Sequence, residues 1–152
     1  MFGFTDLIEG RGFIARVRTD GRAMVEEDED KTWWVYGVNP GGVCAPGATP
    51  KEALQAFRIA LQEVLLDCAV RCDTFAAFRN EVGLIFDSTT KDIVDEWQDA
   101  ALALRKGADA GPLDDLERLR SDSREYTIDV TEVKVERARP LNDGQPQFAQ
   151  AA

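Results

Sequence analysis

The sequence predicts an α+β fold, a small antiparallel sheet of three to five strands packed against a long helix, with an additional helical segment. Three neighbouring patterns indicate it. Residues 31–38 are rich in aromatic and β-branched side chains, which favours a strand. The next four residues, 39–42, contain one proline and two glycines and therefore favour a turn. From Pro50 onward, apolar residues recur at spacings of three and four, as on one face of a helix.

The start of this helix is specified by its capping residues. Thr49 can act as the N-cap, Pro50 suits the first helical position, and Glu52 completes a capping box. We expect one apolar stripe to face the sheet, made of Leu54, Phe57, Leu61, Val64, Leu65 and Cys68.

Two hairpins are predicted before the glycine turn. Residues 12–18 form a strand pattern, and the Asp-Gly pair in 19–21 favours a tight turn, so that 22–26 would return antiparallel. The five consecutive acids of 26–30 favour the solvated turn of a second hairpin over a calcium site, because they lack the spacing of a calcium loop. Residues 1–11 are too mixed to assign.

Further helices are predicted in residues 73–120. A second helix begins near Thr74 and is interrupted near Gly83, and a third begins after 88–90 and stops at Gly107. A linker over 107–112 leads to a short fourth helix marked by Leu113, Leu116 and Leu119.

A last strand is predicted from the alternation in residues 126–130, with a bulge or strand end at 131–132. We expect residues 1–137 to form a single α+β domain. The composition of 138–152, dominated by Pro, Gln, Gly and Ala, predicts a flexible tail.

Composition limits the function classes. The chain has 152 residues, of which 44% are hydrophobic, enough for a sizeable core. It has no membrane-length apolar run and no pattern of a signal peptide, so a cytoplasmic location is expected. The net charge of −10 disfavours nucleic acid as a partner. That charge either steers the chain toward a basic partner or serves solubility.

The sequence contains few residues that favour a catalytic or metal-binding site. Histidine is absent, which removes Ser-His and Cys-His catalysis and most transition-metal sites. Cys68 and Cys72 share a helical face, where packing in the core is favoured over a metal site. The carboxylates of 92–99 are interpreted as a solvated helix face. We predict no catalytic residue, no metal and no cofactor, with an enzyme that uses Cys44 as a minor alternative.

The tryptophan strand offers the best candidate for a binding surface. Trp33 and Trp34 are neighbours on a strand, so their rings leave opposite faces of the sheet. One ring can pack under the helix, and the other is either a partner-binding residue or covered by the later helices. The candidate partner-binding residues are Glu27, Asp28, Glu29, Asp30, Trp34 and Tyr36.

The order of these elements, from residue 22 to residue 70, resembles the N-terminal module of HicB-like antitoxins. That family shows a strand, an acidic or glycine turn, an aromatic-rich strand, a Pro-Gly turn and a Gly-Asp-Thr-x-x-Glu-Ala helix start. The matching residues are Gly42, Gly47, Thr49, Glu52, Ala53 and Leu54. Ala48 replaces the usual Asp, and the proline turn is altered.

The resemblance implies a partial ribonuclease-H-like fold without nuclease activity. Members bind and block small basic toxins that cleave mRNA, and many carry a C-terminal DNA-binding module. Here an acidic helical stretch follows the first helix, so DNA binding is not expected. We interpret 73–120 as a helical insertion and 126–136 as a strand that returns to the sheet.

The function expected on these grounds is that of a non-enzymatic, antitoxin-like binding module that covers a small basic partner. The alternative is an acidic chaperone or adaptor that acts as a dimer. Homo-oligomerisation is compatible with both.

Overall fold

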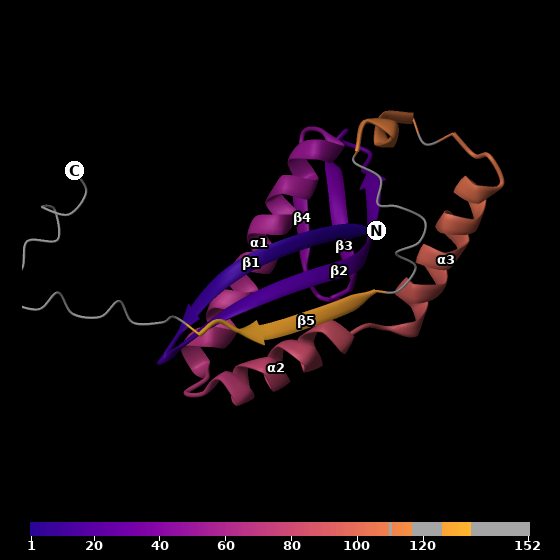
Figure 1. The fold of residues 1–152 in the computed structure, drawn as a ribbon. Helices are drawn as coiled ribbons and strands as arrows, with labels where there is room; N and C mark the ends of the chain where they lie inside the picture. Colours follow the sequence, from indigo (N-terminus) through magenta and orange to yellow (C-terminus); the bar gives the residue numbers. More distant parts are fainter. Residues whose placement is uncertain (110, 117–125, 135–152) are drawn as a thin grey trace, which may run out of the picture.

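The computed structural model describes residues 1–109, 111–116 and 126–134. It confirms the α+β class (Figure 1). In chain order the elements are β1 (Phe2–Gly10), β2 (Phe13–Glu27), β3 (Trp33–Asn39), β4 (Cys44–Gly47), α1 (Pro50–Arg71), α2 (Phe75–Asp87), α3 (Lys91–Arg105), the short 3-10 helix η1 (Gly111–Asp115) and β5 (Thr127–Glu132).

The five strands form one antiparallel sheet around β2, which is long enough to pair with three others. Residues 13–21 of β2 pair with β1, while residues 15–20 also pair with β5. Because the same residues pair with both, β1 and β5 lie on opposite edges of β2. Residues 22–27 pair with β3, which in turn pairs with β4. The strand predicted over 126–136 therefore does return to the sheet, as β5.

The first predicted hairpin is wrong. Asp20 and Gly21 lie inside β2, and the chain instead turns at Arg11 and Gly12, where Gly12 has a positive φ of 79°. Gly21 serves close packing rather than a turn. A Cβ added there would lie 2.3 Å from both the Phe2 ring and the Asn39 carbonyl oxygen. The glycine is therefore needed for space, and residues 1–11, which had no assignment, form β1 beside it.

The predicted start of α1 is confirmed. The Thr49 hydroxyl accepts a hydrogen bond from the Glu52 amide at 3.2 Å. Glu52 reaches back to the amide of Ala48, at 3.1 Å, rather than to that of Thr49. The predicted stripe also faces the core, since Phe57, Leu61, Leu65 and Cys68 are buried and the remaining two members are partly buried.

Two hydrophobic clusters lie on the helical side of the sheet, and α1 packs into both of them. Its first half joins β1, β3 and β4 in a cluster around Val35 and Phe57. Its second half joins β1, β2 and α2 in a cluster around Val17 and Phe78. Figure 1 shows α1 running behind the strands. One helix thus connects both halves of the sheet.

The other helices differ in how firmly they pack. α2 runs without interruption through Gly83, contrary to the prediction, and buries Phe78, Val82 and Phe86. α3 follows the predicted cap region and buries none of its residues. Of the predicted fourth helix, the structure shows η1, while Leu119 lies outside the described residues, as does the predicted tail 138–152. No helix in the described ranges is long and apolar enough to cross a membrane.

The role of Gly21 as a space requirement gives a direct stability test. We expect Gly21→Ala to lower the free energy of unfolding by about 1–3 kcal/mol, because the new methyl group overlaps Phe2 and the backbone of Asn39. The matched control is Gly83→Ala. A Cβ at Gly83 meets nothing within 4 Å, and alanine favours a helix by up to about 1 kcal/mol. Urea unfolding of both variants should therefore give opposite signs, and equal effects would contradict the packing of Gly21.

Candidate protein-binding face of the sheet

The two neighbouring tryptophans leave opposite faces of β3. Trp33 packs against the cluster that contains Val35 and Phe57, on the helical side. Trp34 stacks on Tyr36, with ring centroids 6.1 Å apart and an interplanar angle of 21°. Because side chains alternate along a strand, these two rings lie on the side turned away from α1. Both remain partly exposed, and we call them the aromatic pair.

Strand register identifies the neighbours of the aromatic pair. Trp34 lies opposite Glu26 on β2 and Pro46 on β4. Tyr36 lies opposite Met24 and Cys44. Glu26, Cys44 and Pro46 are exposed, and Met24 is partly buried. The surface therefore has an aromatic centre, apolar and thiol neighbours, and one carboxylate directly beside the indole.

The other end of the same face of β3 is covered. Val38 and Asn39 are buried. The Asn39 amide group donates to the Phe86 carbonyl at 3.4 Å, and the Gly41 amide donates to the Ser88 carbonyl at 2.9 Å. The connection from α2 to α3 therefore lies against this end of the strand. One expectation for the second tryptophan was that the later helices cover it. They cover this end of β3, including Val38, but they leave the aromatic pair partly exposed.

Four acids form a solvated turn between β2 and β3. Glu27 ends β2, and Asp28, Glu29 and Asp30 follow; we call these four residues the acidic turn. All four are exposed.

Two aspartates give the acidic turn a defined shape. The Asp28 side chain accepts from the Glu29 amide at 2.7 Å, and that of Asp30 accepts from the Thr32 amide at 3.0 Å. The second bond lowers the pKa of Asp30. The acids are thus used to shape the turn and to present negative charge beside Trp34.

Arg22 links the covered end of β3 to α3. Its guanidinium is buried and donates twice to the Asn39 side-chain oxygen, at 2.8 and 2.5 Å. It also lies 4.9 Å from the centroid of the Trp97 ring and 3.9 Å from that of Tyr126. Burial lowers the pKa of Arg22. Sequence reasoning missed this group, because nothing near Arg22 in the chain indicates that it is buried.

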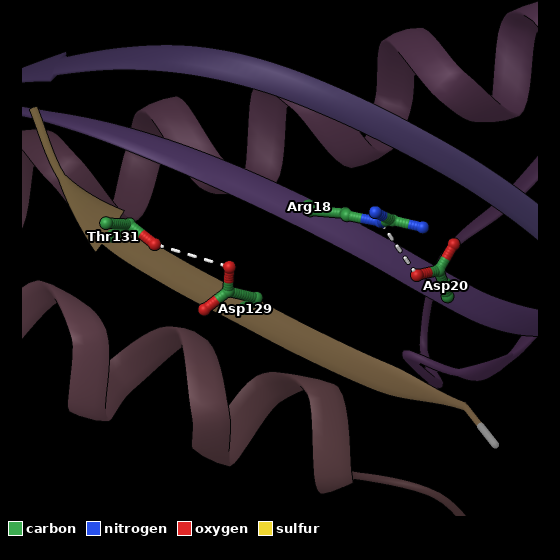
Figure 2. Close-up of polar contacts among 4 residues, drawn as sticks. All are labelled: Arg18, Asp20, Asp129 and Thr131. Atoms are coloured by element: carbon green, nitrogen blue, oxygen red, sulfur yellow. Dashed lines mark hydrogen bonds and ion pairs between the residues drawn. The ribbon is translucent and has the colours of Figure 1, made fainter.

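A second polar surface lies on the outer side of β1, β2 and β5. Figure 2 shows Arg18 and Asp20 on β2, with Asp129 and Thr131 on β5. Arg18 Nε donates to Asp20 at 3.0 Å, and the Thr131 hydroxyl donates to Asp129 at 3.3 Å. Arg18 lies opposite Asp129 in the strand register. Charges of both signs occur here, whereas the acidic turn carries negative charge alone.

The thiols occupy two environments. Cys68 and Cys72 are buried, as predicted, and burial raises the pKa of the Cys68 thiol. Cys44 is exposed, and none of the three cysteines forms a disulfide. Within the described residues, no three Cys, Asp or Glu side chains are grouped so that they could hold a metal ion.

Comparisons with known proteins find no matching family model, no similar curated protein and no similar solved structure.

The environment of Tyr36 gives a titration test of this face. Partial burial is the main cause that raises its pKa, and the negative charge of Glu26 adds to it, followed by those of Cys44 and Asp28. Glu26→Gln should therefore lower the pKa of Tyr36, although burial keeps it above the ordinary value. Because Tyr36 and Tyr126 are the only tyrosines, the phenolate absorbance of Tyr126→Phe reports Tyr36 alone.

The control for this titration is Glu9→Gln, which removes the same charge from the other half of the sheet and should leave the pKa of Tyr36 unchanged. The sign of the linked stability effect also follows. A phenol whose pKa is raised by folding stays protonated longer in the folded state, so stability falls as pH rises above about 10. Glu26→Gln should reduce that loss. A pKa of Tyr36 unaffected by Glu26→Gln would contradict the register of β2 and β3.

Proposed function

We propose that this chain is a non-enzymatic protein-binding module of the HicB-like antitoxin type, which neutralises a small basic partner by covering its surface. The observation that carries the proposal is the aromatic pair, stacked and partly exposed on the open side of the sheet beside an acidic turn. The resemblance in residues 22–70 gives the family, and the fold described above is compatible with it.

The aromatic pair has the properties of a binding anchor. Tryptophan and tyrosine are enriched among the residues whose truncation costs most at protein interfaces. Trp34 and Tyr36 are held by the strand and by each other, so little side-chain entropy is lost when a partner covers them. Their exposed neighbour Pro46 and the partly buried Met24 extend the apolar area that a partner can cover.

The acidic turn supplies steering toward a basic partner. Charges at the rim of an interface mainly accelerate association and set its salt dependence. Glu26 and the acidic turn place five carboxylates in consecutive positions beside Trp34, in a chain whose net charge is −10. A basic protein would therefore be attracted to the same side of the sheet on which the aromatic pair is exposed.

The proposal includes a cytoplasmic location. Three cysteines without a disulfide agree with a reducing compartment. The small basic toxins implied by the resemblance also act on mRNA, which places their antitoxin in the same compartment.

Recovery of the partner tests the proposal. The tagged full chain, expressed in its native host, should retain one small basic protein in stoichiometric amount. That protein should cleave RNA when isolated and be inactive in the complex. If no small basic protein is recovered, or if the recovered protein remains active in the complex, the proposal is wrong.

Substitutions then locate the interface. Trp34→Ala should weaken binding of the isolated partner about 30-fold or more, the equivalent of about 2 kcal/mol for a central aromatic residue. Arg16→Gln, on the outer face of the other half of the sheet, is the matched control and should leave the affinity unchanged. Equal losses would place the interface elsewhere.

The acidic turn requires a variant that keeps its shape. Asp28→Asn and Asp30→Asn retain the oxygens that accept from Glu29 and Thr32, so the loop hydrogen bonds can persist. With Glu27→Gln and Glu29→Gln added, the quadruple variant should associate more slowly and show a weaker dependence on salt. Association kinetics at two ionic strengths measure both effects.

A further inference from the structure

The outward face of α2 carries an open groove that is separate from the aromatic pair. α2 packs its inner face into the core through Phe78 and Val82, on the helical side of the sheet. The residues that line the groove all belong to α2, and Gly83 leaves open space among them. Leu84, beside it, exposes 62% of its surface. Ala76, Arg79 and Asp87 also line the groove, which we call the α2 groove.

The two charged groups of the α2 groove lie at equal spacing on either side of Gly83. Arg79 precedes Gly83 by four residues, and Asp87 follows it by four. Four residues are about one helical turn, or about 6 Å along the axis. Both side chains are exposed, and neither forms an ion pair with a residue that the structure describes. The groove therefore presents one positive and one negative group at equal distances from a glycine.

The position of Asp87 is unfavourable in the isolated chain. It is the last residue of α2, where the carbonyl groups of the helix end carry partial negative charge. No basic residue lies in the last turn of α2. A positively charged side chain from another molecule would offset the repulsion between the Asp87 carboxylate and the negative end of the helix.

We propose that a second copy of this chain docks in the α2 groove, with the two α2 helices antiparallel about a two-fold axis at Gly83. In such an arrangement, a residue that precedes Gly83 by a given number of positions faces the residue of the other chain that follows Gly83 by the same number. Arg79 then meets Asp87 of the partner subunit, and the reverse pair forms at the other end. The absence of a side chain at Gly83 lets the two backbones approach, and Leu84 is covered.

The chemistry of the groove favours this occupant over an unrelated one. A self-complementary surface must match every positive group with a negative group across the axis, and the α2 groove meets that condition with its two charges. Two helices packed through ridges four residues apart cross at about −50°, which keeps contacts within about one turn of the centre. Arg79 and Asp87 lie at that distance.

The dimer is expected to be weak and reversible, because one helix pair buries less than the roughly 800 Å² per partner of a standard interface. The inference does not depend on the proposed function, since the aromatic pair lies on the other side of the sheet. Sedimentation equilibrium of the full chain, up to about 1 mM protein, therefore tests it without any partner. A purely monomeric chain over that range would overturn the proposal.

Charge exchange gives the decisive measurement. Arg79→Asp and Asp87→Arg should each weaken dimerisation at least tenfold, because each creates two like-charge contacts. The double variant should return to within about threefold of the original chain, since the pairs re-form with reversed polarity. Two single variants that dimerise normally, or a double variant as weak as either, would overturn the proposal.

A general effect of net charge would not give the same result as the proposed contact. Arg79→Asp changes the net charge from −10 to −12, and Asp87→Arg changes it from −10 to −8. General repulsion would therefore weaken self-association only in the first variant, whereas the proposed contact weakens it in both. Arg16→Asp, with the same change as Arg79→Asp on a distant surface, should leave the dimer within about threefold. If a reversed charge prevents folding, Arg79→Gln and Asp87→Asn replace it, and each should still weaken the dimer.

Discussion

β2 runs for fifteen residues and exchanges its partner strands midway, and the arrangement of the whole sheet depends on this exchange. Its first half pairs with β1 and β5, and its second half pairs with β3. The register shifts between Arg22 and Ala23, where the two halves meet. Each half has its own hydrophobic cluster, and α1 packs into both. Strand and helix together therefore join two small half-sheets, neither of which has a large core of its own.

Arg22 stands at that junction and accounts for the position of α3. Removing a guanidinium from water costs free energy, and the two hydrogen bonds from Arg22 to Asn39 offset part of that cost. The rings of Trp97 and Tyr126 add cation–π attraction, about 0.5–2 kcal/mol each. No residue of α3 is fully buried, so the contact between Trp97 and Arg22 is one of the few specific contacts that hold it to the sheet.

Local sequence patterns correctly predicted the features that depend on neighbouring residues. They failed where the structure depends on contacts between residues far apart in the chain. The cap at Thr49, the stripe of α1 and the opposite faces of Trp33 and Trp34 need only neighbouring residues, and all are confirmed. The Asp-Gly pair wrongly predicted a turn, because Gly21 is needed to leave space for the ring of Phe2, nineteen residues earlier in the chain.

β1 was not predicted, because the charged residue Asp6 interrupts the apolar face of the strand. The side chains that contact Asp6, those of Arg58 and Gln62, come from the distant helix α1. On the candidate face, alternation along the strand separated Trp34 from Trp33, and the run of acids indicated the solvated turn. The stacking of Trp34 on Tyr36 was not predicted, and the burial of Arg22 depends on residues as distant as Tyr126.

The two surfaces proposed for binding lie on different sides of the sheet, and this has a consequence for assembly. The aromatic pair is exposed on the open side, whereas the α2 groove belongs to the helical layer. Association through α2 would therefore leave both copies of the aromatic pair free, and the dimer would offer two equivalent sites. A partner that is itself dimeric could engage both, and the second contact would then be intramolecular, so that a weak α2 contact would be strengthened by the partner. Self-association and partner binding would thus support each other although they share no residue.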